Sequence, residues 1–168
     1  GVVSEDYLLV GRGLTTAGGA RDFEVVLSPN GTLTGRVTLL SGCGGSNSIG
    51  VTRAEYPVDD NDWHYVAFLI DANGTLSLYI DGALRKSGPW TACGVPSTAN
   101  ARIRAGVSTT TNTPFPGILD EVRVSNRLRT AAEITGNYSG YAQPTISWVT
   151  PKVIERDSPS GQPKTTTV

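Results

Sequence analysis

The chain has 168 residues, of which 38% are hydrophobic and 17% charged, and both shares lie below the averages of about 45–50% and about 25% in globular proteins. Its 20 glycines and 10 prolines favour turns over helices. The net charge of −1 comes without a basic cluster, which argues against nucleic-acid binding, and no apolar stretch reaches the roughly 20 residues of a membrane-spanning helix. Because the chain begins at Gly1 and contains no methionine, we expect a processed product or a piece of a longer protein.

Short runs rich in Val, Ile, Leu, Thr and Tyr are separated by Gly, Asn and Asp turns, which is typical of an antiparallel β-sandwich. Asn30-Gly31, Asn73-Gly74 and Asp81-Gly82 are strong hairpin signals between such runs. In chain order, the predicted strands are 23–27, 33–39, 64–70, 75–80, 83–87, 101–107 and 117–124. The expected fold class is therefore all-β.

One short helix is predicted near the end of these strands. Thr130 can cap it, and Glu133 stands three residues later, as in a capping box. The composition shifts after Tyr141. Ile146, Trp148 and Val149 predict one more strand, and the Pro/Ser/Thr-rich end that follows is typical of a linker or tail. The expected organisation is a sandwich over 1–140, incomplete at its amino-terminal end, and a strand plus tail over 141–168. We expect the tail to be held by the fold, by neighbouring subunits or by crystal contacts.

Three segments together resemble the laminin G-like, concanavalin A-like jelly-roll superfamily of extracellular modules. Residues 62–67 and 74–82 are similar to the family's "W-H-x-V-A … G-x-L-x-L-Y-V-D-G" core. Residues 115–127 are similar to "F-x-G-x-I-D-E-V-R-I-Y-N-R", and residues 128–134 to "A-L-S-A-A-E-I". The resemblance covers roughly residues 5–138. It implies a jelly roll with one short capping helix, at an extracellular or cell-surface location.

The amino-terminal end departs from this family pattern. Only residues 1–6 precede the segment 7–13, where the family has a further strand or two. A sandwich lacking an internal strand exposes a groove of unpaired N–H and C=O groups. We expect the strand around Ile146, a strand from another copy or another protein chain, or a cleaved upstream piece to fill it. A domain of a larger surface or filament protein is the leading hypothesis.

Two cysteines and one histidine are the remaining reactive side chains. Cys43 and Cys93 lie in Gly-rich loops, and in an extracellular module they are expected to form a disulfide, free thiols being the alternative. His64 belongs to the family's strand motif, and the sequence has no Gly-x-Ser-x-Gly elbow to pair with it as a catalytic base. The sequence also lacks the Glu-x-Asp-x-x-Glu acid pair of the glycosidases of this fold. A non-enzymatic function is predicted.

Calcium is the cofactor to consider, because a hard cation takes several oxygen ligands. The resemblance places Asp120 where the family often has a buried acidic residue that is sometimes a calcium ligand. The alternative is a salt bridge from Asp120 to Arg123 or Arg127. The acidic loop 59–62 offers further oxygens, or is a solvated turn.

A carbohydrate-binding module is the alternative function, possible with or without calcium. Such a module stacks exposed aromatic rings on its glycan. The candidate residues are Tyr56, Trp90, Tyr138 and Tyr141, and each has the alternative role of a core plug or strand cap.

Overall fold

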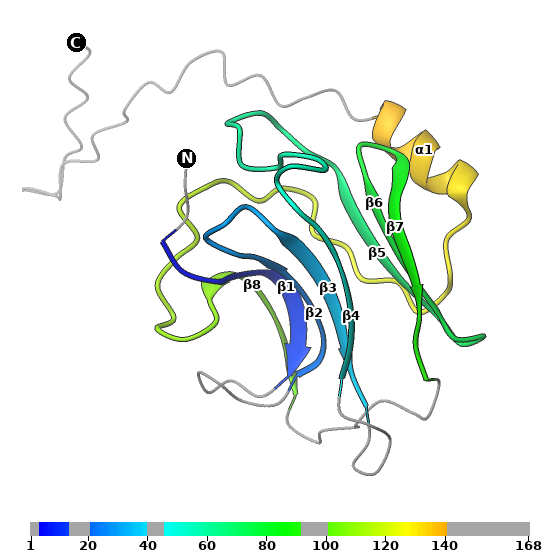
Figure 1. Ribbon diagram of the computed structural model, residues 1–168, viewed down its shortest axis with the longest axis horizontal. Coiled ribbons are helices and arrows are strands. Elements are labelled where there is room, and N and C mark those ends of the chain that lie inside the picture. The colour runs from blue at the N-terminus through cyan, green and yellow to red at the C-terminus, as the bar shows by residue number, and fades with distance from the viewer. Residues whose placement is uncertain (1–3, 14–20, 40–45, 92–100, 141–168) are drawn as a thin grey trace, which may run out of the picture.

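The computed structural model describes residues 4–13, 21–39, 46–91 and 101–140. Within these ranges the chain folds into two antiparallel sheets and one helix (Figure 1). The larger sheet has the strand order β4-β3-β2-β1-β8, and the smaller has the order β5-β6-β7. In chain order, the strands of the larger sheet are β1 (Tyr7–Gly13), β2 (Arg21–Leu27), β3 (Leu33–Thr38), β4 (Ser46–Val51) and β8 (Arg102–Ser108). Those of the smaller sheet are β5 (Val66–Asp71), β6 (Thr75–Ile80) and β7 (Ala83–Pro89).

The predicted hairpins are confirmed. β2 pairs with β3 across the turn at Asn30-Gly31, and β5, β6 and β7 form the predicted meander. Asp81 and Gly82 both have positive φ, 53° and 74°, as a two-residue hairpin turn with the right-handed strand twist requires. The predicted strands do not include β1 or β4, and the Ser, Asn and Gly residues of β4 give little strand signal.

The core lies between the two sheets. Alternate residues of β6 supply Leu76, Leu78 and Ile80, which are fully buried, because successive strand residues point to opposite faces. They pack in one cluster with residues of the larger sheet, among them Leu33 and Val37. β4 packs against β6 and β7, so the sheets meet most closely along that side.

The helix α1 (Ala131–Gly140) begins with the predicted capping box. The Glu133 amide donates to Thr130 Oγ1 over 3.2 Å, and the Thr130 amide donates to Glu133 Oε2 over 2.9 Å. Ile134 anchors the helix, since its side chain is 1% exposed. None of the described helices is both long enough and apolar enough to cross a membrane.

Candidate functional site

The two sheets differ in width, and this leaves one side of the sandwich open. Five strands face three, and β5 forms the border of the smaller sheet, with β6 as its ladder partner among the described residues. All six residues of β5 are only partly buried. The segment 117–128 crosses between the sheets and leads into α1 (Figure 1). We call the region bordered by β5, segment 117–128 and α1 the open side.

The segment 117–128 exposes a set of large apolar side chains. Their exposed fractions are 62% for Ile118, 48% for Val122 and 52% for Val124, and Leu119 and Leu128 are exposed as well. Exposed apolar side chains that follow one another in this way are common at interaction surfaces of proteins. The segment is not a strand, although the sequence predicts one over 117–124: no ladder joins it to another described residue.

A bend at Glu121 gives the local reason for this difference. Its φ is 51°, in the left-handed region that a non-glycine residue seldom adopts. The Asp120 carboxylate accepts the Glu121 amide over 2.8 Å and holds the bend. The backbone thus turns at Glu121, and the apolar side chains on both sides of it are exposed.

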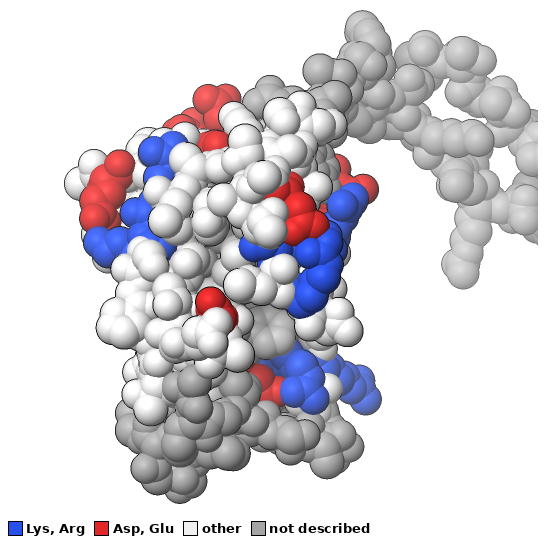
Figure 2. Space-filling view, turned by 90° about the vertical axis from the view of Figure 1, so that its right-hand side faces the viewer, with Lys and Arg blue, Asp and Glu red and all other residues white. Residues whose placement is uncertain are grey.

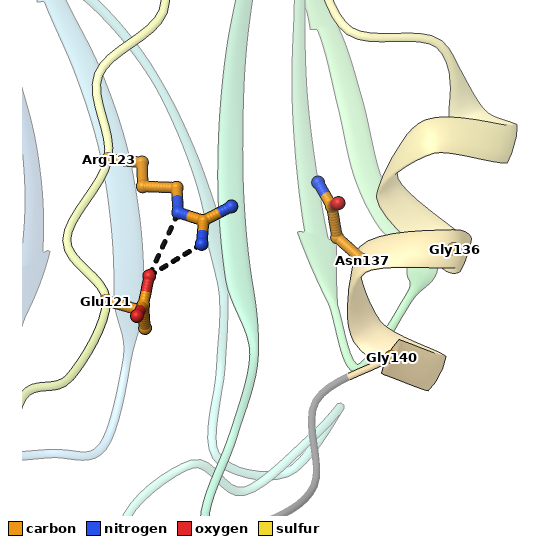
Figure 3. A pocket seen from close by; sticks show the side chains of 5 residues that line it. All are labelled: Glu121, Arg123, Gly136, Asn137 and Gly140. Atoms are coloured by element: carbon orange, nitrogen blue, oxygen red, sulfur yellow. Dashed lines mark hydrogen bonds and ion pairs between the residues drawn. The ribbon is translucent and has the colours of Figure 1, made fainter.

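A pocket of about 280 Å³ opens between this segment and α1. Glu121 and Arg123 line it from the segment, and Gly136, Asn137 and Gly140 line it from the helix. Figure 3 shows Arg123 and Asn137 pointing into the space between the two elements. Arg123 Nη2 donates to Glu121 Oε2 over 2.6 Å, so its charge is balanced within the pocket. The pocket offers amide, guanidinium and carboxylate groups together.

Near the start of β5, a polar network surrounds His64. Its Nδ1 lies 2.8 Å from Asp81 Oδ2, and its Nε2 lies 2.9 Å from Asp60 Oδ1. Burial lowers the pKa of His64, but the hydrogen bonds and negative charges of Asp81 and Asp60 outweigh it and raise the pKa above its ordinary value. A protonated ring donates to both carboxylates, so the network favours an imidazolium.

The two carboxyl groups respond in the opposite direction. Burial raises the pKa of Asp81, and the hydrogen bonds from His64, from Tyr56 and from the Tyr65 amide more than offset it, leaving the pKa below its ordinary value. The hydrogen bond from His64 likewise lowers the pKa of Asp60. This network holds the β6–β7 turn against the start of β5.

Three of the aromatic residues considered for glycan stacking are described, and each has a partner. The Trp90 indole donates to the Asp71 carbonyl over 2.8 Å and packs on the core. The Arg85 guanidinium lies 3.9 Å from the ring centre of Tyr56, which it covers on one face. Tyr138, on α1, is 42% exposed, with its ring 6.3 Å from that of Tyr65. Tyr141 lies outside the described residues.

The acidic residues considered for calcium are spread out. Within the described ranges, no three or more His, Cys, Asp or Glu side chains gather as a metal site would require. Asp120 is exposed, and Asp60 accepts hydrogen bonds from His64 and from the Asp62 amide. The described residues alone therefore do not assemble the six to eight oxygens that calcium takes, and calcium at Asp120 stays a prediction. Cys43 and Cys93 lie outside the described residues, as does the strand expected around Ile146.

The sequence analysis missed a second carboxylate centre. Glu5 accepts hydrogen bonds from Ser108, Thr110, Thr111 and Thr113, at 2.6 Å for Ser108 Oγ and 2.9 Å for Thr111 Oγ1. The hydroxyls of Ser108 and Thr113 contribute most to a pKa of Glu5 of about 2. The threonine-rich run 109–113 is the only signal in the sequence, and it does not point to a carboxylate more than 100 positions away.

Comparison with known proteins agrees with this architecture. The family model described as the concanavalin A-like lectin/glucanases superfamily matches residues 3–135, and the chain belongs to this superfamily. No curated protein sequence matches it significantly. Its fold is similar to the binding domain of botulinum neurotoxin serotype G, with a TM-score of 0.54 and 18% identity over 82% of this chain and 31% of that chain.

A second solved structure gives the same result. The receptor binding domain of a botulinum neurotoxin C/D mosaic serotype matches with a TM-score of 0.56 and 12% identity, over 82% of this chain and 32% of that chain. The chain thus spans about a third of the length of these toxin domains. At these identities the likeness establishes the fold, an antiparallel jelly-roll sandwich.

Proposed function

We propose that the chain is a non-catalytic, extracellular binding module for adhesion or assembly, part of a larger surface or filament protein. It binds an extended segment of another copy or another protein chain, which adds as a strand at the open side. The observations that carry the proposal are the border strand β5, which is only partly buried, and the exposed apolar segment 117–128. Edge strands and exposed apolar surface together favour binding by strand addition.

The surface charge fits a protein partner better than a polyanion. Seen from the side that carries α1, Lys and Arg groups alternate with Asp and Glu groups, with uncharged surface between them (Figure 2). The ion pairs Arg123–Glu121 and Arg127–Glu133 contribute to this mixture. Affinity then comes from the backbone hydrogen bonds of the added strand, and specificity from its contacts with the apolar side chains that it covers.

The neighbouring carboxyl groups of Asp120 and Glu121 do not support hydrolysis of a glycosidic bond. Glu121 pairs with Arg123, and Asp120 accepts the Glu121 amide. Glycosidases instead set two carboxyl groups on opposite sides of a sugar bond.

The disulfide between Cys43 and Cys93, which suits an extracellular module, belongs to this proposal.

Selection of displayed peptides on the full chain tests the proposal. A phage library of short random peptides is panned against the protein, and the enriched sequences are expected to alternate apolar and polar residues. They should bind the wild type and Leu84→Asp but not Val122→Asp. Leu84 is the matched control, because it is 51% exposed and lies on β7, at the border of the smaller sheet opposite to β5. No enrichment, or binding that Val122→Asp leaves intact, overturns the proposal.

Carbohydrate binding is the second candidate function, and the pocket beside α1 favours it. Asn137, Arg123 and Glu121 offer the planar polar groups that hold sugar hydroxyls, and the exposed ring of Tyr138 lies on the same helix. Calcium bound near Asp120 belongs to this second proposal. Reproducible signals on a glycan array that disappear in Asn137→Ala support it, and equal signals in both proteins contradict it.

A further inference from the structure

We infer that the chain's own residues 145–150 occupy the open side when no partner strand is bound, so that the site is regulated by its own tail. This inference rests on the proposed function, because a partner strand would have to displace residues 145–150 before it binds. In this arrangement, the strand predicted around Ile146 lies beside segment 117–128.

The position of the helix end supplies the first argument. α1 ends at Gly140, and Gly140 is one of the residues that line the pocket between the helix and segment 117–128. The chain therefore leaves the described structure at the rim of the open side (Figure 3). Four residues separate Gly140 from Thr145. At up to about 3.3–3.6 Å per residue, they let the following strand begin close to this rim.

The sequence after the helix supplies the second argument. Residues 145–150 read Thr-Ile-Ser-Trp-Val-Thr and stand between Pro144 and Pro151. They are β-branched, aromatic or hydroxyl-bearing, as in strands, and the two prolines limit the strand to the usual length of about five to six residues. Ile146 and Trp148 fall on one face of such a strand, which suits an apolar surface.

The strain and exposure at the open side supply the third argument. Ile118, Val122 and Val124 are each about half exposed or more, so a covering strand removes apolar area from water. The left-handed backbone of Glu121 is unfavourable for a residue with a Cβ atom. Pairing along segment 117–128 would straighten this bend and relieve that strain.

Amide hydrogen exchange on the full chain tests the inference. In the wild type, the amides of 146–150 and of 118–124 should exchange about tenfold slower than those of 159–167. Trp148→Asp should speed both sets, while the amides of β2 and β3 keep their protection. Val122→Asp changes the surface that the tail covers, and it should also speed exchange of the amides of 146–150. Val153→Asp, the same kind of change in the same tail but beyond Pro151, should alter neither set.

Two results overturn the inference. The first is exchange of 146–150 as fast as that of 159–167 in the wild type. The second is protection that grows with protein concentration, because it assigns the strand to a second copy. Either result leaves the proposed function standing if selected peptides still bind in a way that Val122→Asp abolishes. If the tail is protected and such peptides fail to bind both the wild type and Trp148→Asp, in which the tail is displaced, the proposed function fails instead.

Discussion

Phe68 of β5 packs directly over Gly35 of β3 and joins the border of the smaller sheet to the middle of the larger one. A Cβ atom built on Gly35 would lie 2.5 Å from Phe68 Cε2 and 2.8 Å from Cγ. The bare backbone of Gly35 thus makes room for the ring. β5 is partly exposed along its length, so this contact fixes its distance from the opposite sheet.

Gly35→Ala is expected to destabilise the fold, since the added methyl group forces the Phe68 ring or the β5 backbone to move. Overpacking of a core costs about 1–3 kcal/mol. Urea unfolding measured by circular dichroism gives the change in the free energy of unfolding. An unchanged midpoint would show that β5 adjusts freely and that the contact does not position it.

Gly136→Ala is the matched control, the same substitution at a glycine with space around it. Apart from its chain neighbours and the nearby backbone of the helix, no atom of the described residues lies within 4 Å of the Cβ position, and residue 136 is inside α1. Alanine favours the helix over glycine by about 0.8–1 kcal/mol, so this variant should be slightly more stable than the wild type. The two variants therefore shift the unfolding midpoint in opposite directions.

The His64 network predicts a pH dependence of stability. The pKa of His64 is raised in the folded state, so its protonation contributes to the free energy of unfolding. This contribution is complete below the ordinary pKa of 6.5 and is lost as the pH rises through the pKa in the folded state. The lowered pKa of Asp81 and of Asp60 gives a contribution that is present above the ordinary value of 3.8 and lost as the pH falls through the folded values. The network is thus most stabilising between about pH 4 and about pH 6.5.

His64→Gln tests the alkaline part of this profile. Glutamine can still donate a hydrogen bond but does not titrate, so the decline in unfolding free energy above about pH 6.5 should flatten. Tyr56→Phe is the control: it removes the 2.7 Å hydrogen bond from Tyr56 to Asp81 and leaves His64 in place. It should lower stability and keep the decline. The same slope in His64→Gln as in the wild type would assign the decline to other groups.

Thr130→Ala should loosen α1 at its first turn. It removes the acceptor of the Glu133 amide, and loss of such a cap costs about 1 kcal/mol. Ser139→Ala, which removes a hydroxyl bonded back to the Thr135 carbonyl, should be nearly neutral. Exchange of the 131–136 amides separates the two variants, and equal exchange would mean that the burial of Ile134 alone holds the helix.

Glu5→Ala should free the loop after β8. The carboxylate accepts hydrogen bonds from four hydroxyl groups of residues 108–113, and its pKa of about 2 means that mild acid does not release them. Faster exchange of the 109–113 amides is expected at neutral pH in the variant. In the wild type, the same amides should stay protected down to about pH 3. Loss of wild-type protection near the ordinary carboxyl pKa would contradict this role of Glu5.

Local signals explain which parts of the fold could be predicted. Turn dipeptides such as Asp81-Gly82 and the capping pair Thr130–Glu133 act within a few residues, and the structure confirms them. Segment 117–128 has a strand-like pattern, but a strand also needs a neighbour to pair with, and the pattern does not say whether one is there.

The candidate site was harder to predict, because its contacts join residues far apart in the chain. His64 meets Asp81 across a hairpin, and Glu5 meets Thr113 across almost the whole domain. The absence of an amino-terminal strand, expected from the family pattern, stays a prediction. The pocket between segment 117–128 and α1 could not be predicted, since it depends on how the two elements cross.

The place of β1 in the larger sheet has a mechanical consequence. β1 runs antiparallel to both β2 and β8 and hydrogen-bonds to each of them. A pull on the amino-terminal end along the strand axis therefore loads two ladders at once, in shear, and the bonds cannot open one after another. The hydrogen bonds from Ser108 and Thr111 to Glu5 must also break before β1 slides. A module built in this way resists tension applied through its amino-terminal end.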